Sequence, residues 1–510
     1  MSEKIEITKR AGVVSFFTLV SRVAGLVRDA VVAFFFGTTD AADAFYMAFT
    51  LPNLLRRFVA EGALTIAFIP VFSETLKKSR EEALHLASLT FSYLSIILAG
   101  LTVAGIALAP FLVTVIAFGF KDQPEKFALT VTLTRLCFPY IFLVSLAALA
   151  MGILNALKRF ASPAAAPILF NVGLIAGACF SPWFHPPVYG LALGVLLGGL
   201  GQLLLQWGEL VRLDWRPRFA WGSHPALWRL LGLMVPAAYG AAVYQCNVII
   251  VRLFASFLPA GSVSYLWYAD RVFEFPVGVF AIAVATAIQP TLSDQVAEKD
   301  MTAFKESLDF GLRFNFLITI PAMAGLIVLA QPIVMVLFQR GAFSPLDSME
   351  TASTLIAFAV GLPFLGAVRI LVPAFYALKD AKRPVVIATL AVAANLVFAF
   401  LLVRPLAHEG LALALSLAAA VNFIGLMRVL RKYVGGWAWR NTIRVVAQTM
   451  AASAVMAGLL WIPQHYGWVF REGGLWRHGL ELAVLVSVGA GLYFLLSGAG
   501  HRSKLVRFFR

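Results

Sequence analysis

The sequence predicts an all-α protein that crosses a membrane many times. Of its 510 residues, 60% are hydrophobic and only 13% are charged, whereas soluble domains are nearer half apolar and a quarter charged. Long apolar runs recur along the whole chain, and one membrane crossing needs about 20 apolar residues. The charges are spread so evenly that no segment has the composition of a soluble catalytic domain. Disordered, coiled-coil and disulfide-rich secreted classes are excluded on the same grounds.

Fourteen transmembrane helices are expected from these runs, which end at proline, glycine and charge clusters. We expect them at 11–36, 44–73, 84–118, 128–157, 163–181, 187–211, 226–256, 263–293, 306–338, 351–378, 384–403, 409–430, 441–463 and 476–498. The first run follows three basic residues but lacks a small-residue cleavage site. It is therefore interpreted as a retained helix and not as a signal peptide.

The basic residues indicate how these helices are oriented. With the N-terminus in the cytoplasm, the cytoplasmic segments hold 26 Lys and Arg, and the outer loops hold six. Cytoplasmic loops of membrane proteins carry such an excess. Because the helix number is even, both termini are expected in the cytoplasm. The net charge of +15 then mainly reflects topology, and no nucleic-acid partner is predicted.

An internal repeat divides the chain into lobes. Four sets of residues recur in order at a spacing of about 220. They pair Pro70, Ser73 and Glu74 with Pro290, Ser293 and Asp294, residues 156–158 and Pro163 with 377–379 and Pro384, Pro139 with Pro363, and Asn171 with Asn395. We expect six-helix lobes at 1–222 and 223–433, followed by a terminal helix pair within 434–510. Parallel repeats with a site between the halves are a transporter design, although a duplicated bundle can also be a scaffold.

Arginines within the predicted spans indicate what is transported. Nine arginines lie there, and each costs about 2.5–3.5 kcal/mol at a helix centre. Asp29 can pair with only one of Arg22, Arg28 and Arg56. An excess of positive charge in a low dielectric favours an anion, and guanidinium groups suit phosphate oxygens. We therefore predict a central cationic cavity between the lobes that binds a phosphate-bearing substrate.

Simpler interpretations exist for two of the charge pairs. Arg57 with Glu61, and Arg271 with Glu274, have the spacing of ion pairs along one helix face. Pro52, in the second span, is expected to break or kink its helix, as happens where backbone lines a cavity.

Enzymatic function finds no support in the sequence. The seven histidines are scattered without metal-ligand spacing, and the three cysteines form no pair. Phosphate-loop, dinucleotide-binding and nucleophile-elbow motifs are missing. We predict no catalytic residue, no metal and no cofactor, so an ion gradient, the membrane potential or the substrate gradient is expected to drive transport. The G-x-x-x-G at Gly194 and Gly198 is attributed to ordinary helix packing.

Three segments carry a resemblance to a known family. SRVAGLVRDA at 21–30, FGTTDAADAFYMAFTLPNLLRRFVAEGALTIAFIPVF at 36–72 and SVSYLWYADRVFEFPVGV at 262–279 closely resemble the MurJ (MviN) family of lipid II flippases. This family is part of the multidrug/oligosaccharidyl-lipid/polysaccharide exporter superfamily. The resemblance runs essentially end to end. It implies translocation of lipid II, the undecaprenyl-pyrophosphate-linked peptidoglycan precursor, by alternating access from the inner to the outer leaflet of the bacterial cytoplasmic membrane.

The resemblance also implies functional residues and partners. The substrate-binding positions of the family fall on Arg22, Arg28, Arg56, Arg271 and Asn53, and its important acidic and polar positions fall on Asp29, Asp43, Glu61, Ser264 and Glu274. Helices 13 and 14 are expected to form a groove for the lipid tail. Expected partners are lipid II, membrane lipids and cell-wall synthesis proteins. A drug exporter would have twelve helices and an acidic cavity. A flippase for another polyprenyl-pyrophosphate-linked glycan and a non-transport scaffold of the cell-wall machinery stay open.

Overall fold

Helices make up nearly all of the described structure. The computed structural model describes residues 2–57, 64–216, 218–278, 282–435, 440–470 and 473–505, and these contain no β-strand. Within them, eight helices are long and apolar enough to cross a membrane, or nine if the bent pair α14 and α15 is one span. The predicted class, an all-α multi-pass membrane protein, is confirmed.

The chain forms two compact units. Unit 1 comprises residues 1–264 and 340–343, and unit 2 comprises residues 265–339 and 344–510. The helix α10 (Pro225–Ala255) packs against α3, α4 and α5 and so lies in unit 1, whereas the repeat assigns this segment to the second lobe. The lobes at 1–222 and 223–433 were inferred from the sequence repeat, and their boundaries stay a prediction.

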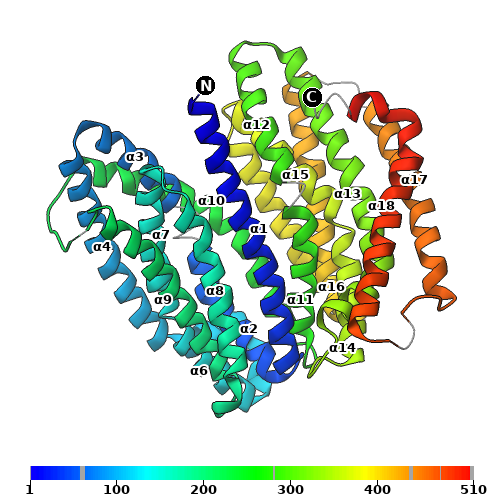
Figure 1. Ribbon diagram of the computed structural model, residues 1–510, viewed down its shortest axis with the longest axis horizontal. Helices are drawn as coiled ribbons and strands as arrows, with labels where there is room; N and C mark the ends of the chain where they lie inside the picture. Colours follow the sequence, from blue (N-terminus) through cyan, green and yellow to red (C-terminus); the bar gives the residue numbers. More distant parts are fainter. Residues whose placement is uncertain are drawn as a thin grey trace. The chain divides into compact units, whose positions relative to one another are not determined.

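Unit 1 is a bundle of ten helices within the described residues, shown in blue to green in Figure 1. Besides α10, these helices are α1 (Ser2–Phe36), α2 (Asp40–Arg56), α3 (Leu64–Lys78), α4 (Arg80–Ala107), α5 (Ala109–Ile116), α6 (Pro124–Cys137), α7 (Tyr140–Ala156), α8 (Ala161–Cys179) and α9 (Tyr189–Arg212). Short 3₁₀ turns are η2 (Phe118–Asp122) and η3 (Ser181–Trp183). Large apolar side chains such as Phe68, Phe72 and Leu149 fill its core between α3, α4 and α7.

Unit 2 contains the helices from α11 onward. They are α11 (Ser262–Pro276), whose first three residues are in unit 1, α12 (Ile282–Ala297), α13 (Met301–Phe338), α14 (Pro345–Ala359), α15 (Leu362–Ala377), α16 (Lys382–Tyr433), α17 (Arg440–His465) and α18 (Leu475–Leu505). The apolar side chains Leu308, Leu312 and Phe375 are fully buried between α13 and α15.

Several predicted spans are divided, and proline is the usual reason. Pro110 opens α5 after α4, Pro139 precedes α7, and Pro363 lies in the first turn of α15. Proline lacks the amide that a continuing helix needs. Of the break or kink expected at Pro52, the break is wrong, because α2 runs through Pro52 to Arg56, and the kink stays a prediction.

The sequence repeat is reproduced in local backbone structure. Lys158 and Lys379, which match across the repeat, end α7 and α15 with positive φ angles of 61° and 59°. In both turns the amide of the next residue donates to the carbonyl five residues earlier, at 2.8 and 2.9 Å. This is a common way to end a helix. The duplicated residues therefore code for the same helix terminus in each unit.

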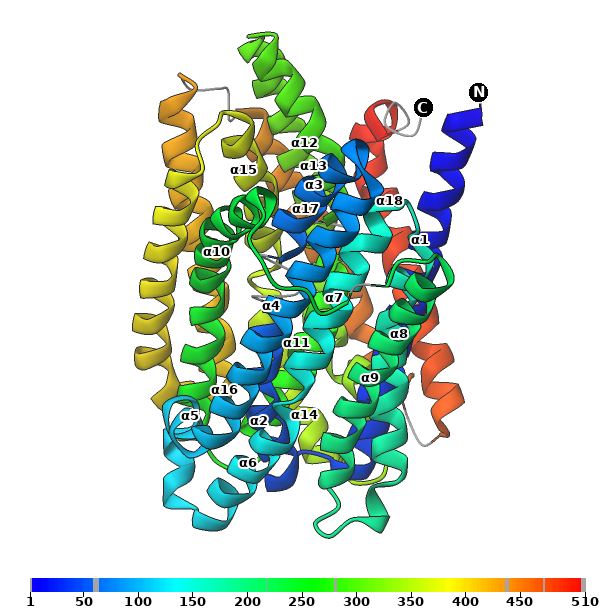
Figure 2. The same cartoon turned by 90° about the vertical axis from the view of Figure 1, so that its left-hand side faces the viewer.

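Five glycines bring α8 and α9 into backbone contact. A Cβ placed on Gly173, Gly177, Gly190, Gly194 or Gly198 would lie between 2.3 and 2.9 Å from a backbone atom of the facing helix. Side chains at these positions would force the helices apart, so the glycines permit the close packing. The two helices run side by side in both views (Figures 1 and 2). The prediction that Gly194 and Gly198 serve helix packing is confirmed.

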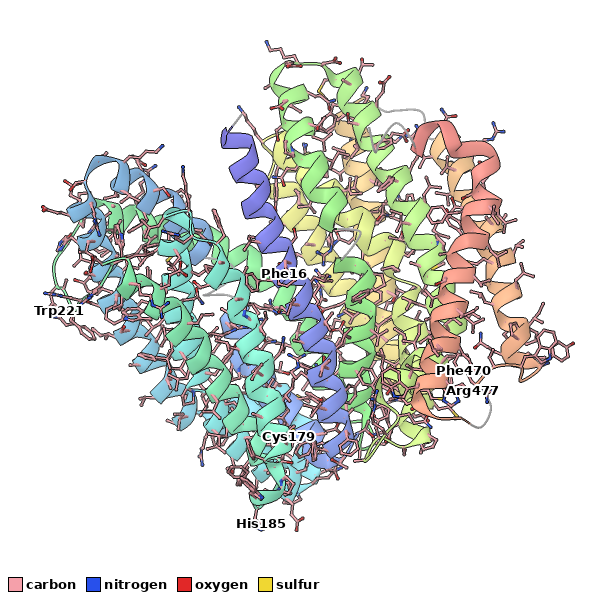
Figure 3. The ribbon with its side chains drawn as sticks, viewed as in Figure 1. Phe16, Cys179, His185, Trp221, Phe470 and Arg477 are labelled. Carbon is pink, nitrogen blue, oxygen red and sulfur yellow. The ribbon has the colours of Figure 1, made fainter. Side chains whose placement is uncertain are left out.

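The terminal pair α17 and α18 packs on α13 within unit 2. The Tyr493 hydroxyl donates to the Leu317 carbonyl at 2.7 Å. In the turn between the two helices, the Glu481 carboxylate accepts from the Phe470 amide and from Arg477 Nε, both at 2.8 Å. Phe470 and Arg477 lie close together there (Figure 3). One carboxylate therefore holds this turn together.

Candidate functional site

Arg28, one of the predicted substrate-binding arginines, is held by two neighbouring side chains. Its Nε donates to Asp29 Oδ1 at 3.0 Å, and its second terminal nitrogen lies 2.8 Å from both carboxylate oxygens of Asp29. The other terminal nitrogen donates to Asn171 Oδ1 at 3.0 Å. Asn171 Nδ2 in turn donates to the Ser21 carbonyl at 3.0 Å. This network positions the guanidinium group of Arg28 against α1 and α8.

Close packing of α1 and α8 makes this network possible. Gly25 lies beside the Asn171 amide, and a Cβ at this position would be in ordinary van der Waals contact with Asn171 Nδ2 at 3.9 Å. The sequence predicted that Asp29 could pair with only one nearby arginine, and in the structure it pairs with Arg28. Asn171 was not among the predicted site residues. Its match to Asn395 in the repeat was the signal that could have identified it.

Two further predicted residues meet on α2. Arg56 Nε donates to Asn53 Oδ1 at 3.1 Å, one helical turn away.

Two other predicted site residues are Arg22 and Glu61. Arg22 is half-buried on α1, six residues before Arg28. Glu61 lies outside the described residues, and so does its predicted ion pair with Arg57.

Asp43 is the buried centre of a second polar cluster in unit 1. Its carboxylate accepts from Lys126 Nζ at 3.0 Å, the Gly261 amide at 2.8 Å, the Ser264 amide at 3.0 Å and the Ser264 hydroxyl at 2.7 Å. Lys126 also reaches Asp40 at 2.6 Å. Asp43 is 1% exposed, so its oxygens are committed to these donors. We interpret this cluster as an anchor of the fold.

Arg271 lies on α11 in unit 2 and has two neighbours on its own helix. One of its terminal nitrogens donates to Glu274 Oε2 at 3.0 Å, which is the ion pair that the spacing allowed. Its guanidinium group also lies 4.5 Å from the centre of the Trp267 ring, a cation–π distance. The Glu274 side chain is 45% exposed. One acidic and one aromatic side chain of the same helix therefore orient the Arg271 guanidinium group.

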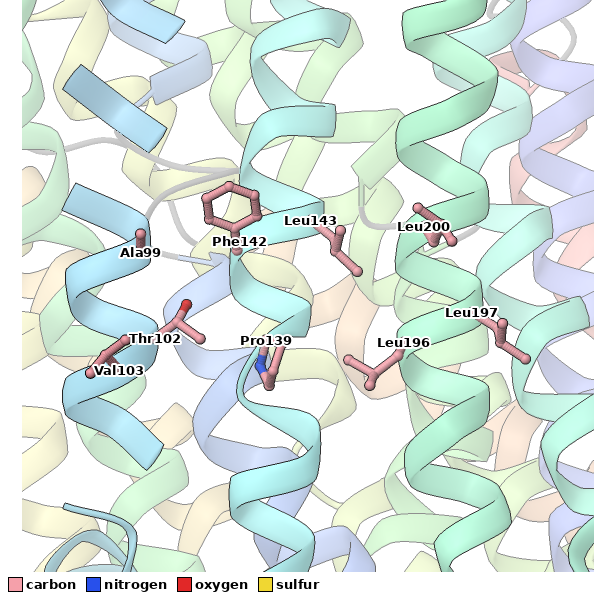
Figure 4. Close-up of a pocket in the computed structure, with 9 residues that line it drawn as sticks. All are labelled: Ala99, Thr102, Val103, Pro139, Phe142, Leu143, Leu196, Leu197 and Leu200. Carbon is pink, nitrogen blue, oxygen red and sulfur yellow. The ribbon is translucent and has the colours of Figure 1, made fainter. Parts of the chain in front are cut away.

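An apolar cavity of about 450 Å³ opens on unit 1 (Figure 4). Its lining comes from α4, α7, α9 and the proline before α7, and consists of Ala99, Thr102, Val103, Pro139, Phe142, Leu143, Leu196, Leu197 and Leu200. No charged residue lines it, so its chemistry suits hydrocarbon and not a phosphate group.

Comparison with known proteins decides the family. The family model described as "Lipid II flippase MurJ" matches residues 32–470. The chain belongs to the MurJ family. A MurJ relative from Burkholderia cenocepacia, named lipid II flippase MurJ, is 38% identical over 94% of this chain and 95% of its own length. A relative from Vibrio cholerae, named probable lipid II flippase MurJ, is 36% identical over 95% and 94%.

Solved structures give the same family and a wider fold class. A structure described as lipid II flippase MurJ in an inward closed conformation superposes with a TM-score of 0.81 at 26% identity, covering 96% of this chain and 99% of that one. An inward-facing multidrug transporter of the MATE family in the MOP superfamily superposes at 0.69 with 14% identity, covering 83% and 99%. The second likeness shows a shared fold alone.

Proposed function

We infer that the protein is a lipid II flippase. The observation that carries this conclusion is the family match over residues 32–470, together with a relative 38% identical over 94% of the chain that is named lipid II flippase MurJ. It is a transporter and not an enzyme, and its work is to move a lipid-linked peptidoglycan precursor between membrane leaflets.

We propose that Arg28 and Arg271 supply donors to the pyrophosphate of lipid II. Asp29 and Asn171 hold the Arg28 guanidinium group from one side. Glu274 and Trp267 orient that of Arg271. A guanidinium group presents five N–H donors in a fixed plane, so anchoring some of them directs the rest. Preorganisation of this kind lowers the entropic cost of binding the anion. Arg22, Arg56 and Asn53 are proposed to supply further donors to the substrate.

We also propose a topology for the transporter. Fourteen crossings place both termini in the cytoplasm and the protein in the bacterial inner membrane, as the 26-to-6 distribution of basic residues predicts. The break within α16 supports two crossings there, since Ala407 has φ 44° and ψ −126°. The two lobes alternate access by rocking, driven by an ion gradient, the membrane potential or the substrate gradient. Cell-wall synthesis proteins are proposed as partners.

Reconstituted vesicles test the function. The purified full chain is incorporated with fluorescent lipid II, and a membrane-impermeant quencher reports how much lipid reaches the outer leaflet. We expect faster equilibration than in protein-free vesicles. A parallel sample holds a polyprenyl-pyrophosphate carrying an unrelated glycan. Equal rates for the two lipids would assign a broader glycan specificity, and no acceleration of either would contradict flippase activity.

A further inference from the structure

Three side chains with metal-binding chemistry converge in unit 2, apart from the residues assigned above. Glu350 comes from α14, and His408 and Glu409 come from α16. Their potential ligand atoms all lie within 4.8 Å of one another. The sequence gives no spacing signal for this group, because Glu350 is separated from the other two by almost 60 residues.

A break in α16 lies beside the cluster. The left-handed φ of Ala407 interrupts the helix directly before His408, so His408 and Glu409 are the first two residues of the second part of α16. Further along, the Ser416 hydroxyl donates to the Ala357 carbonyl at 2.8 Å and joins α16 to α14. This hydrogen bond therefore also holds α14 and α16 together on one side of the cluster.

The His408 side chain is buried and directed at Glu350. The residue is 8% exposed, and its Nε2 lies 3.3 Å from Glu350 Oε2. This contact lacks the geometry of a hydrogen bond, and within the described part of the chain the nitrogen has no hydrogen-bond partner beside it. The Tyr265 ring packs against the imidazole at a centroid distance of 5.0 Å and limits its rotation. A buried polar atom of this kind calls for an explanation, and a shared ligand would supply one.

The charge of the cluster favours a cation. Glu350 and Glu409 are close together, and no Lys or Arg pairs with either of them among the described residues. Two nearby carboxylates repel each other when both are ionised. The neighbouring Asp347 adds to the acidic character, although it accepts from the Ser344 amide at 2.7 Å. A doubly charged ion would offset this excess.

We propose that Glu350, His408 and Glu409 bind a divalent transition-metal ion, with Zn²⁺ as the best match. One imidazole and two carboxylates suit zinc, whereas Ca²⁺ and Mg²⁺ prefer oxygen ligands alone. Ligand atoms at about 2.0–2.1 Å from a tetrahedral zinc ion are about 3.3 Å apart, which is the observed distance between His408 Nε2 and Glu350 Oε2. Water completes the fourth position. The ion ties the start of α14 to the break in α16.

Metal binding to the purified full chain tests the proposal. The affinity tag is removed, the protein is stripped with a chelator, and Zn²⁺ is titrated by calorimetry with Mg²⁺ as the comparison ion. We expect one Zn²⁺ per chain and no response to Mg²⁺. Co²⁺ should give the visible absorption of a tetrahedral site. His408→Gln and Glu409→Gln should each weaken Zn²⁺ binding at least about tenfold, the lower end of what loss of a supporting group costs.

Matched variants separate this site from incidental binding. His185→Gln changes an exposed histidine in the turn between α8 and α9 (Figure 3), and Glu125→Gln changes an exposed glutamate in α6. Both should bind Zn²⁺ as the parent does. A chain that takes up no Zn²⁺, or one whose binding is unaffected by H408Q and E409Q, would overturn the proposal, and the cluster would then be an ion pair alone. Lipid flipping is measured separately, so failure of the metal site leaves the flippase assignment intact.

Discussion

The hydroxyl of Ser264 donates to Asp43 at 2.7 Å across 221 residues of sequence. Both residues were predicted to be functional, and the structure places them in one buried cluster with Lys126. The carboxylate of Asp43 has four donors around it, so its contribution is to hold the start of α11 against α2 and α6 within unit 1.

Asp43→Ala should destabilise the protein strongly. Among the described residues it leaves the buried Lys126 ammonium with the exposed Asp40 as its one carboxylate partner, and breaking a buried ion pair costs about 3–5 kcal/mol. Thermal unfolding in detergent should show a large fall in melting temperature. Asp40→Asn is the matched control, because the Asp40 side chain is 57% exposed and such pairs are worth about 0–1 kcal/mol. Similar melting temperatures for the two variants would refute the anchor.

Arg28→Ala should abolish lipid II translocation while leaving membrane insertion intact. Arg28→Lys should restore only part of the activity, because an ammonium group cannot bond to Asp29 and Asn171 in the planar geometry of a guanidinium. Complementation of a depleted strain, with protein level measured in the membrane fraction, reads this out. Arg135→Ala removes a more exposed arginine that donates to the Ile106 carbonyl and should complement fully. Normal growth with R28A would contradict the role given to Arg28.

Arg271→Ala should also abolish translocation, and Glu274→Gln decides between two explanations. If the pair only stabilises α11, both variants should lose a similar small amount of stability, as expected for a partly exposed pair at i,i+3. If Arg271 binds pyrophosphate, R271A should lose activity at an unchanged melting temperature, while E274Q keeps measurable flipping. We expect the second pattern in reconstituted vesicles. Equal, parallel losses in both assays would favour simple ion pairing.

Rocking of the predicted lobes should give two distance populations on the cytoplasmic side. Spin labels at Trp221 and Lys299, both exposed, would report this after replacement of Cys137, Cys179 and Cys246. Substrate should change the relative weights of the populations, as expected for two states that bind it with different affinity. One unchanging distance with and without lipid II would rule out the motion.

Truncation after Lys432 should impair flipping by removing the proposed tail groove of α17 and α18. A polyprenyl chain cannot share a surface with Arg28 and Arg56 without desolvating charges, which costs several kcal/mol. Serine substitution of the exposed Leu495 on α18 and of the exposed Leu390 on α16 provides a finer comparison, with loss of flipping expected only for the former. Normal flipping by the truncated chain would show that the pair is dispensable.

The all-helical, membrane-spanning class followed directly from the sequence, because apolar runs are local signals, whereas Pro52 shows that a proline alone does not locate the end of a helix. The matched turns at Lys158 and Lys379 show that the repeat, too, was readable. Contacts between distant segments were not. Nothing in the sequence relates loop 340–343 to α1, since the link is a backbone bond from the Ala342 amide to the Phe34 carbonyl at 2.8 Å. Asn171 and His408 likewise acquire their surroundings only when helices pack.

The glycine seam between α8 and α9 has a mechanical consequence. Helices in backbone contact cannot slide without separating, because carbonyl oxygens and Cα atoms of one fit between those of the other. The hairpin of α8 and α9 is therefore rigid, and its internal geometry should be the same in every state of the transport cycle. Helix bending during the cycle is expected elsewhere, at interrupted helices such as α16. Gly177→Ala would force α8 and α9 into a different packing angle, with or without substrate.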